Sequence, residues 1–321
     1  MKRRFTRRGA LRILGAGFAL PLGGLGLGML RDTPAPTQWH GEVLGAVSSM
    51  TLWHANPRVA ERAISQMRVE IDRLENIFSL YRPNSEITRL NSHGRIDNPS
   101  GDLVYVLEQS RRIAEISGGA FDPTIQPLWR LYASPLVSNR SSIDTALTLV
   151  DYTRLSADAH SVRFATPAMA ASLNGIAQGY ITDRITEILG NGGFENAMIE
   201  LGETRALGSA PNGSPFSVAL VDPLTPSNVE RNLALANRAL SVSAGYGLTF
   251  ADGRHHIFDP HTGDSPRQLA QVAVLSPKAT WADALSTAIY VAGEARTRDL
   301  LLAYPGSNAI LFRNDGTQLE I

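Results

Sequence analysis

Residues 281–288 read WADALSTA, an alanine-rich and otherwise apolar stretch that contains a single acid, Asp283. The apolar pattern predicts a buried helix from Trp281 to Ala292. Thr287 follows Asp283 by one helical turn, so both side chains share one face. A buried carboxylate is costly unless a structural partner or a cation compensates its charge. This helix alone leaves both alternatives open.

Helical and strand-like segments alternate on both sides of this helix. Apolar residues at spacings of three and four predict further helices at 57–78, 101–117 and about 176–190. Short apolar strands are predicted at Ala197–Leu201, Phe216–Val221, Ala239–Val242, Gln271–Leu275 and Asn308–Phe312. Residues 130–165 give only strand-like pieces and loops. The pattern indicates an α+β fold in one compact domain, with mixed or antiparallel sheets, rather than a regular βαβ array.

The composition excludes several classes of function. The chain has a formal net charge of zero, which gives no support to a nucleic acid or a membrane surface as partner. It has no cysteine, which excludes disulfides, thiolate metal sites, a cysteine nucleophile and a lipid anchor on cysteine.

The N-terminus predicts an export signal. Basic residues precede a glycine-rich, weakly apolar run from Ile13 to Leu30, and TRRGALR places Arg7 and Arg8 as twin-arginine signals do. We therefore expect residues 1–38 to be a leader ahead of one domain, 39–321, and the protein to act in the periplasm. An uncleaved membrane anchor is the alternative.

Three motifs bear on chemistry. In GGAFDPT, 118–124, the simpler interpretation is a helix end and a turn in which Asp122 forms local hydrogen bonds. In LNGIAQGY, 173–180, the glycines flank a helix start, where free N–H groups favour phosphate, but the spacing is not that of a Rossmann or Walker motif.

HHIFDPHTG, 255–263, is the third motif, and its histidines do not have a familiar zinc spacing. We expect His256 to face inward and His255 and His261 to be exposed loop residues. Asp259 is expected to orient the turn. On the WADALSTA helix, the oxygens of Asp283 and Thr287, with Ser286 nearby, are hard ligands that suit Mg²⁺.

Seven segments together resemble the ApbE family of FAD:protein FMN transferases, over nearly the whole chain from about Met50 onward. They are SMTLW, SLYRPNSEITRLN, GGAFDPT, NGIAQGY, SVSAGY, HIFDPHTG and ADALSTA. The resemblance implies a T-fold-related flavin transferase domain without a Rossmann motif. It implies Mg²⁺-dependent cleavage of FAD, transfer of FMN to a threonine or serine hydroxyl of an exported client protein, and release of AMP.

The resemblance also implies roles for individual positions. His256 and Asp283 match catalytic residues, His256 assisting proton transfer near the phosphates. The implied metal ligands are the Gly175 carbonyl, Asp283 and Thr287, with Ser286 where some members carry a further acid. The implied flavin-binding positions are Met50, Tyr81, Ala120, Phe121, Asp122, Gln178 and Phe258.

The sequence departs from the family pattern in several places. Gln178 stands where a lysine or glutamate is common, and the common LGGD reads LGET, with Glu203 in place of the second glycine. The common SGxY reads SAGYG, which retains Tyr246, and the usual MGT reads SMT. These departures indicate a divergent branch.

The leader and the segments SMTLW, FSLYRP and TWADALSTA also resemble the periplasmic NosX branch, which serves nitrous oxide respiration. That resemblance implies the membrane protein NosR as the client. Two other functions stay open, namely hydrolysis of FAD to FMN and AMP, and a non-catalytic FAD carrier or assembly factor. The sequence leaves the client and the oligomeric state undetermined.

Overall fold

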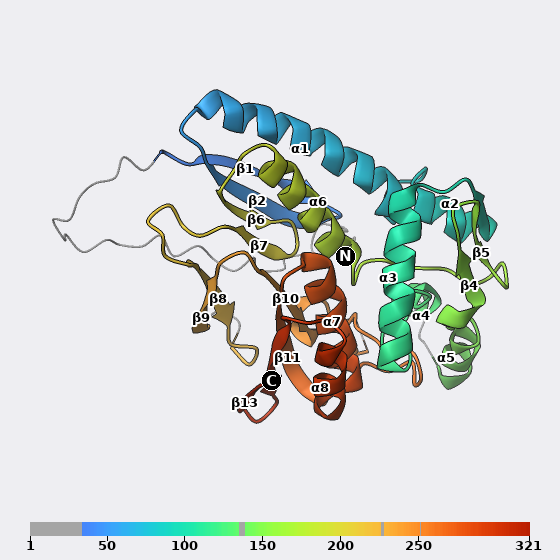
Figure 1. Cartoon of the computed structure of the whole chain (residues 1–321). Coiled ribbons are helices and arrows are strands. Elements are labelled where there is room, and N and C mark those ends of the chain that lie inside the picture. Colours follow the sequence, from blue (N-terminus) through green and yellow to red (C-terminus); the bar gives the residue numbers. More distant parts are fainter. Residues whose placement is uncertain (1–33, 135–138, 226–227, 251) are drawn as a thin grey trace, which may run out of the picture.

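The computed structural model describes residues 34–134, 139–225, 228–250 and 252–321 (Figure 1). The described helices are α1 (Pro57–Phe78), α2 (Glu86–His93), α3 (Gly101–Ser117), α4 (Gln126–Tyr132), α5 (Arg140–Leu147), α6 (Ala177–Asn191), α7 (Ala279–Ala292) and α8 (Glu294–Leu302). Short 3-10 helices lie at Tyr152–Arg154 and Gly245–Gly247.

The strands of the described residues form three antiparallel sheets. The eight-stranded sheet has the order β1-β2-β6-β7-β10-β11-β12-β13. Its strands are β1 (Thr37–Val43), β2 (Ala46–Trp53), β6 (Asn196–Glu200), β7 (Thr204–Leu207), β10 (Ala239–Ala244), β11 (Leu269–Ser276), β12 (Asn308–Arg313) and β13 (Gln318–Glu320). The smaller sheets contain β3 (Arg95–Asp97), β5 (Ser161–Phe164) and β4 (Leu155–Ala157), and the hairpin of β8 (Phe216–Val221) with β9 (Val229–Leu235).

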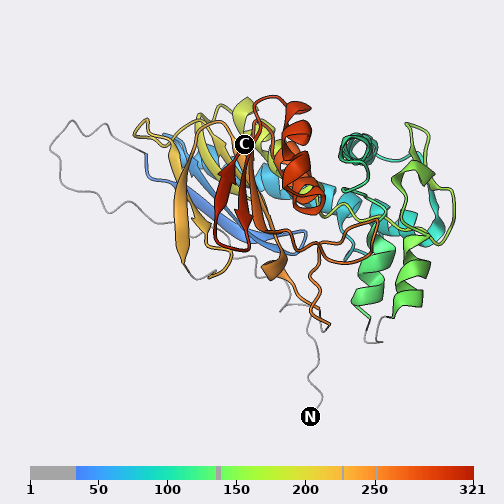
Figure 2. The same ribbon diagram turned by 90° about the horizontal axis from the view of Figure 1, so that it is seen from below.

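The large sheet is covered on both faces. Helices α1, α6 and α7 lie along one face, where the main hydrophobic core is buried (Figure 1). On the other face, Phe216 and Leu235 of the β8–β9 hairpin pack with Leu240 and Ile310 of the sheet. Figure 2 shows the green helices α4 and α5 in a separate lobe beside the sheet. Because both faces are covered, the central strands β11 and β12 are buried over nearly their whole length and do not alternate between apolar and polar residues.

Helices α6 and α7 are joined by two aspartates, each of which binds the first turn of the other helix. Asp183 of α6 accepts hydrogen bonds from the backbone N–H groups of Ala279 and Thr280, at 2.8 and 2.9 Å. Asp283 of α7 accepts one from Gly179 N–H, at 3.0 Å. A carboxylate at a helix N-terminus satisfies unpaired N–H groups and interacts favourably with the helix dipole. Neither helix has a side-chain cap of its own.

Glycine is required where these two helices meet. A Cβ at Gly179 would lie 2.3 Å from the carbonyl oxygen of Ala279 and 2.8 Å from Cβ of Asp283. Any side chain there would separate α6 from α7 and lengthen the hydrogen bond that Asp283 accepts.

The predicted α+β fold is confirmed, and so are the helices at 57–78 and 101–117. The helix predicted from Trp281 begins two residues earlier, at Ala279, because Asp183 caps the preceding N–H groups. Residues 130–165, predicted as strand pieces and loops, also contain α5, whose Asn139 and Ser142 form a reciprocal capping box.

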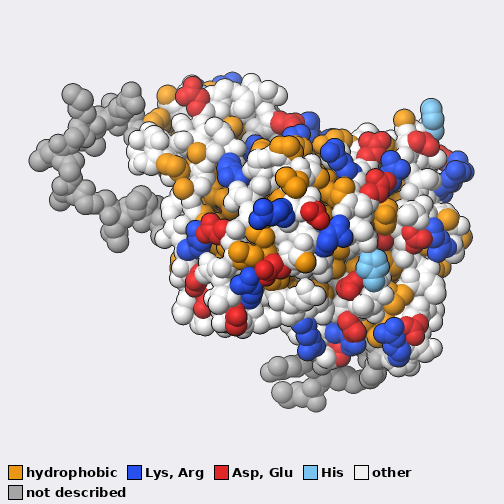
Figure 3. Space-filling view, turned by 60° about the horizontal axis from the view of Figure 1, so that its bottom comes forward, with side chains coloured by type: hydrophobic (Ala, Val, Ile, Leu, Met, Phe, Trp, Pro, Cys, Tyr) orange, Lys and Arg blue, Asp and Glu red, His pale blue; other side chains and the backbone are white. Residues whose placement is uncertain are grey.

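The predicted leader, residues 1–38, falls almost entirely outside the described residues, and β1 begins at Thr37. Within the described part of the chain, no helix is both long and apolar enough to cross a bilayer. On the face shown in Figure 3, basic and acidic side chains are interspersed, in keeping with a net charge of zero.

We predict that Asp183→Ala lowers the free energy of unfolding by about 1–3 kcal/mol, because it leaves two buried N–H groups of α7 without an acceptor. Urea denaturation followed by circular dichroism measures this loss. The control is Glu187→Ala, four residues further along the same helix, where the acid is exposed. An Asp183→Ala protein as stable as the control would show that the cap does not stabilise the fold.

Candidate functional site

A cavity of about 430 Å³ opens where the first turns of α6 and α7 meet β10. The turn between β6 and β7, the β8 strand, α4 and the segment around His256 complete its wall. The predicted site residues that line it are Ala120, Phe121, Asp122, Gly175, Gln178, His256, Phe258, Asp283 and Thr287. Segments far apart in the sequence therefore converge on one cavity.

Asp283 lies at the base of this cavity and is 4% exposed. Burial raises its pKa, although the hydrogen bond from Gly179 N–H acts in the opposite direction. Among the described residues, that N–H is the single hydrogen-bond donor recorded for this carboxylate, and no basic side chain forms an ion pair with it. The structural partner of Asp283 is thus one backbone amide, which leaves most of its charge uncompensated.

Glu203 is a second buried acid in the same cavity wall. Glu203 is 8% exposed, and the hydroxyl of Ser241 on β10 partly offsets the effect of burial on its pKa. Burial raises the pKa of Glu203 well above its usual range, and the negative charge of Asp283 nearby adds to the effect. Two buried carboxyl groups of like charge favour either a shared proton or a cation between them.

Thr287 and Gly175 lie next to each other in the wall. A Cβ at Gly175 would be 3.2 Å from Oγ1 of Thr287 and 3.2 Å from the ring of Phe121. The absence of a side chain at Gly175 therefore leaves its backbone and the Thr287 hydroxyl accessible from the cavity.

Ser286 does not line the cavity. Its hydroxyl is fully buried, 3.0 Å from Ser241 Oγ and 2.8 Å from Ser243 Oγ, and it also donates to the carbonyl of Asp283 at 2.9 Å. These contacts place Ser286 behind the predicted metal ligands, where it ties α7 to β10.

The donor set fits a hard divalent cation. A carboxylate, a hydroxyl and a backbone carbonyl, from Asp283, Thr287 and Gly175, are the oxygen types that Mg²⁺ accepts while keeping positions for water and phosphate. Within the described residues there is no cluster of three or more His, Cys, Asp or Glu side chains that would hold a metal. The site thus offers mixed oxygen donors and not a cage of acids.

His256 faces the cavity as predicted. Its Nδ1 lies 3.4 Å from the carbonyl oxygen of Leu248. A carbonyl can only accept, so we assign the ring hydrogen to Nδ1, which leaves a lone pair on Nε2. Burial lowers the pKa of His256 to about 4, and the contact with Leu248 acts in the opposite direction. The ring is therefore neutral near pH 7 and can accept a proton.

The expectation for the neighbouring histidines is half correct. His261 is exposed, and its Nε2 lies 3.0 Å from the carbonyl of Gly118. His255 was expected to be exposed and is instead partly buried, packing edge-on against Tyr290 with Nε2 2.9 Å from the carbonyl of Pro266. His255 and His256 both contact protein because this segment is a loop and not a regular strand.

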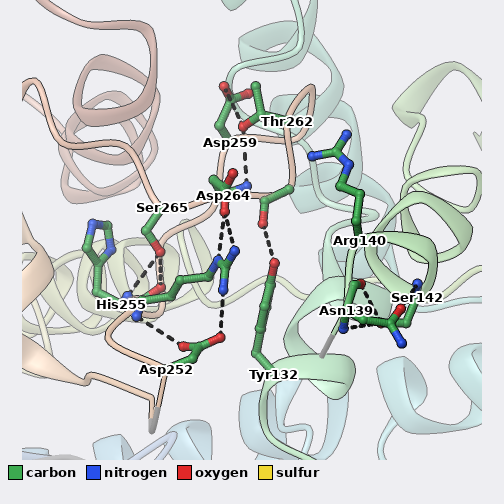
Figure 4. A network of polar contacts seen from close by, with 12 residues as sticks. Tyr132, Asn139, Arg140, Ser142, Asp252, His255, Asp259, Thr262, Asp264 and Ser265 are labelled. Atoms are coloured by element: carbon green, nitrogen blue, oxygen red, sulfur yellow. Dashed lines mark hydrogen bonds and ion pairs between the residues drawn. The ribbon is translucent and has the colours of Figure 1, made fainter. Parts of the chain in front are cut away.

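The loop that carries His256 and Phe258 is fixed to α4. The guanidinium group of Arg254 binds Asp252 and Asp264 at 2.7 Å each and lies 5.1 Å from the ring centre of Tyr132 (Figure 4). Tyr132 also donates to the carbonyl of Gly263. Its ring stacks on Phe258, with centres 4.8 Å apart.

Asp259 orients the turn, as expected. Its carboxylate accepts hydrogen bonds from His261 N–H at 2.9 Å and from the hydroxyl of Thr262 at 3.2 Å (Figure 4). Asp122 has a comparable structural role although it borders the cavity. One of its oxygens binds Thr124, and the other accepts from Tyr152 N–H at 2.9 Å.

Two predicted flavin-binding residues lie away from this cavity. Met50 of β2 is 1% exposed and belongs to the main hydrophobic core. Tyr81, after α1, is 51% exposed. The structure therefore does not bring either side chain into the wall that contains Asp283.

Gln178 reaches the cavity beside the β6–β7 turn. A Cβ at Gly202 would lie 2.5 Å from the amide of Gln178, and Gly202 has a φ of +96°. The glycine of LGET is thus required both for its backbone conformation and for the space that Gln178 fills.

Sequence reasoning missed Asp183, Trp129 and Glu200. Asp183 lies four residues after Gly179, on the buried face of α6, and this position among apolar neighbours is the signal that would have found it. Trp129 and Glu200 line the cavity from α4 and β6. No sequence pattern indicates them, because their segments meet the cavity only after folding.

Known proteins of similar sequence carry the name FAD:protein FMN transferase. The FAD:protein FMN transferase of Haemophilus influenzae is 29% identical over 242 residues, which cover 69% of this chain and 70% of that protein. The protein of the same name from Treponema pallidum is 28% identical over 302 residues, covering 85% of this chain and 83% of that protein.

Solved structures share the fold. The flavin transferase ApbE from Vibrio cholerae superimposes with a TM-score of 0.79 at 24% identity, covering 89% of this chain and 97% of that one. The ApbE protein from Thermotoga maritima gives 0.77 at 27% identity, covering 89% and 96%. The profile of the ApbE family matches residues 44–311, the segment that holds the cavity and every residue of its wall, and the chain therefore belongs to the ApbE family.

Proposed function

We propose that this protein transfers FMN from FAD to a threonine or serine hydroxyl of a client protein and releases AMP. Membership of the ApbE family and the names of its relatives support this activity. The structural observation that carries the proposal is the cavity in which Asp283, Thr287 and Gly175 lie together beside a second buried acid, Glu203.

The reaction exchanges the phosphoanhydride bond of FAD for a phosphoester bond to the client. The client hydroxyl oxygen forms a bond to the phosphorus of the FMN half, and the bond from that phosphorus to the bridging oxygen breaks, so that AMP leaves with both electrons. His256 accepts the hydroxyl proton at Nε2. Mg²⁺, held by Asp283, Thr287 and the Gly175 carbonyl, would neutralise charge on the phosphate oxygens.

Other groups of the cavity bind and orient FAD. Phe121, Phe258 and Trp129 offer aromatic surface to its ring systems. The first turn of α6, which begins at Ala177, lies beside the predicted ion and is a favourable place for a phosphate group. Gln178 offers an amide to the cofactor in place of a charge.

We further propose that the protein acts in the periplasm after twin-arginine export, on a respiratory client such as NosR. The basic leader with Arg7 and Arg8 and the resemblance to the NosX branch support this assignment. Because the twin-arginine route exports folded proteins, the protein is able to bind FAD before export.

Two alternatives differ in what accepts the FMN group. If water replaces the client hydroxyl, the same residues hydrolyse FAD to FMN and AMP. If neither occurs, the protein is an FAD carrier. Incubation with FAD, Mg²⁺ and a client fragment distinguishes them, since transfer gives covalently fluorescent client, hydrolysis gives free FMN, and a carrier gives neither.

We predict that Asp283→Asn abolishes both labelling of the client and release of AMP, because an amide does not neutralise a divalent cation. Gel fluorescence and chromatography of AMP measure the two products. Asp299→Asn, an exposed change on α8, is the control and should be fully active. Full activity of Asp283→Asn would refute the metal assignment.

We predict that His256→Gln lowers kcat by about 10²-fold or more and changes the FAD dissociation constant little, since the ring moves a proton and does not bind the flavin. Because a base must be neutral to act, and the pKa of His256 is about 4, its contribution is present above that pH and is lost below it. The pH profile of kcat/KM at saturating Mg²⁺ tests this. A histidine-dependent loss of rate centred near pH 6.5 would contradict it.

A further inference from the structure

The strand β10 has one edge that is paired over its whole length and one edge that is not. Against β11 it pairs at every position from Ala239 to Ala244. Against β7 it pairs only at Ala239 and Leu240, because β7 begins at Thr204, directly after the β6–β7 turn. Along Ser241–Ala244, no strand of the described residues lies on the β7 side.

The pairing with β7 shows which backbone groups point to this open edge. Ala206 N–H donates to the carbonyl of Arg238, just before β10, at 2.9 Å. In an antiparallel strand the N–H and C=O of one residue point to the same neighbour, and the direction alternates along the strand. The backbone groups of Val242 and Ala244 therefore point to the β7 side as well, beyond the end of β7.

The open edge borders the cavity. Leu240–Ala244 all line it, although their side chains alternate between the two faces of the sheet. Ser243 faces α7, where its hydroxyl lies 2.8 Å from Ser286 Oγ and 3.3 Å from Thr287 Oγ1, and Val242 faces the other side. Because residues of both faces line the cavity, the strand edge between them opens into it.

Exposed apolar side chains surround the same opening. Val47 at the start of β2, Val242 and Tyr246 are 72, 38 and 41% exposed, and all three line the cavity. The hydroxyl of Tyr246 donates to Gln271 at 2.7 Å, which holds its ring at the mouth. Single exposed apolar residues are common, but several at one opening indicate a surface that binds a partner.

The client segment that carries the acceptor hydroxyl fits both features. Its hydroxyl must enter this cavity for the proposed transfer, so its backbone must cross the opening. An extended peptide offers N–H and C=O groups at the spacing of a strand edge and places alternate side chains on opposite faces. A flavin ring has hydrogen-bonding groups along one short edge, which match one residue of a strand and not two in succession.

We propose that the acceptor segment of the client binds as an added strand along the open edge of β10, with hydrogen bonds to Val242 and Ala244. The acceptor residue then lies opposite Ser243, with its side chain on the α7 face toward Thr287. Its two neighbours lie opposite Val242 and Ala244. The inference rests on the transfer activity proposed above and deepens it, because it names the conformation in which the client presents its hydroxyl.

Short peptides test the inference without knowledge of the client. Peptides of about ten residues, with a central threonine and otherwise random sequence, are incubated with the protein, FAD and Mg²⁺, and the most strongly labelled peptide becomes the probe. Methylation of one backbone nitrogen at a time removes single N–H groups. Methylation of the residue before or after the threonine should lower labelling at least about 10-fold, since those N–H groups point to β10. Methylation two residues away should change labelling little, and losses without this alternation would overturn the inference.

Amide hydrogen exchange, followed by NMR, locates the peptide on the protein. The probe is the same peptide with valine in place of the threonine, so that no transfer occurs. The Val242 and Ala244 amides should exchange at least about 10-fold more slowly when this peptide is saturating, and FAD with Mg²⁺ alone should not slow them. The amides of Ser241 and Ser243 point to β11 and are the internal control. Protection of Val242 and Ala244 by FAD alone would show that the edge binds the cofactor and would contradict the inference.

Val242→Gln and Val69→Gln form a matched pair of variants. Both valines are exposed, but Val69 lies on α1 and does not line the cavity. Val242→Gln should raise KM for the peptide about 10-fold through lost apolar contact and leave the FAD dissociation constant nearly unchanged, whereas Val69→Gln should change neither. Weaker FAD binding with unaltered KM for the peptide would refute the inference. The methylation and exchange measurements need no variant and decide the matter if Val242→Gln does not fold.

Failure of this inference and failure of the proposed function give different results. If peptides are labelled without the alternation and without protection of the edge, transfer stands and strand addition is wrong. If a whole client fragment is labelled and no peptide is, a segment alone does not bind, and strand addition is again wrong. If neither is labelled, the proposed transfer itself fails, and the inference fails with it.

Discussion

Asp183 and Asp283 each accept hydrogen bonds from the first turn of the partner helix, and this reciprocal contact fixes α6 against α7. Both helices lack a side-chain cap of their own, so each N-terminus depends on the other helix. The close approach at Gly179 makes the contact possible, since a Cβ there would meet the backbone of α7. This packing sets the geometry of the site, because the residues that form it lie on or beside these two helices. They are Gly175, Gln178, Asp283 and Thr287.

The same packing buries two acids, Asp283 and Glu203, where water does not solvate their charge. Asp283 accepts one hydrogen bond, from the Gly179 N–H group, and burial raises the pKa of both Asp283 and Glu203. Burial of two carboxyl groups with so few partners costs stability. A domain whose core is well covered on both sheet faces tolerates that local cost.

The loop that presents His256 to the cavity is stabilised by other contacts. The segment around His256 has little regular structure, and it is held by the Arg254 ion pairs and the stack of Tyr132 on Phe258. The ion pairs lie within the loop itself, and the stack joins the loop to α4. The cavity is therefore assembled from two separately stabilised parts, a rigid helix pair that presents oxygens and a clamped loop that presents a neutral imidazole.

The sequence by itself determined the α+β class, the long helices and the motif residues, because periodicity and glycine or proline signals act locally. It identified Asp283, Thr287, Gly175 and His256 as one site only through their order along the chain. Tertiary structure alone decided that Ser286 lies behind the wall, that Met50 and Tyr81 lie elsewhere, and that Asp183 starts α7 at Ala279. The physical reason is that these outcomes depend on contacts between segments roughly a hundred residues apart. The local sequence pattern of one segment does not indicate which distant segment it will contact.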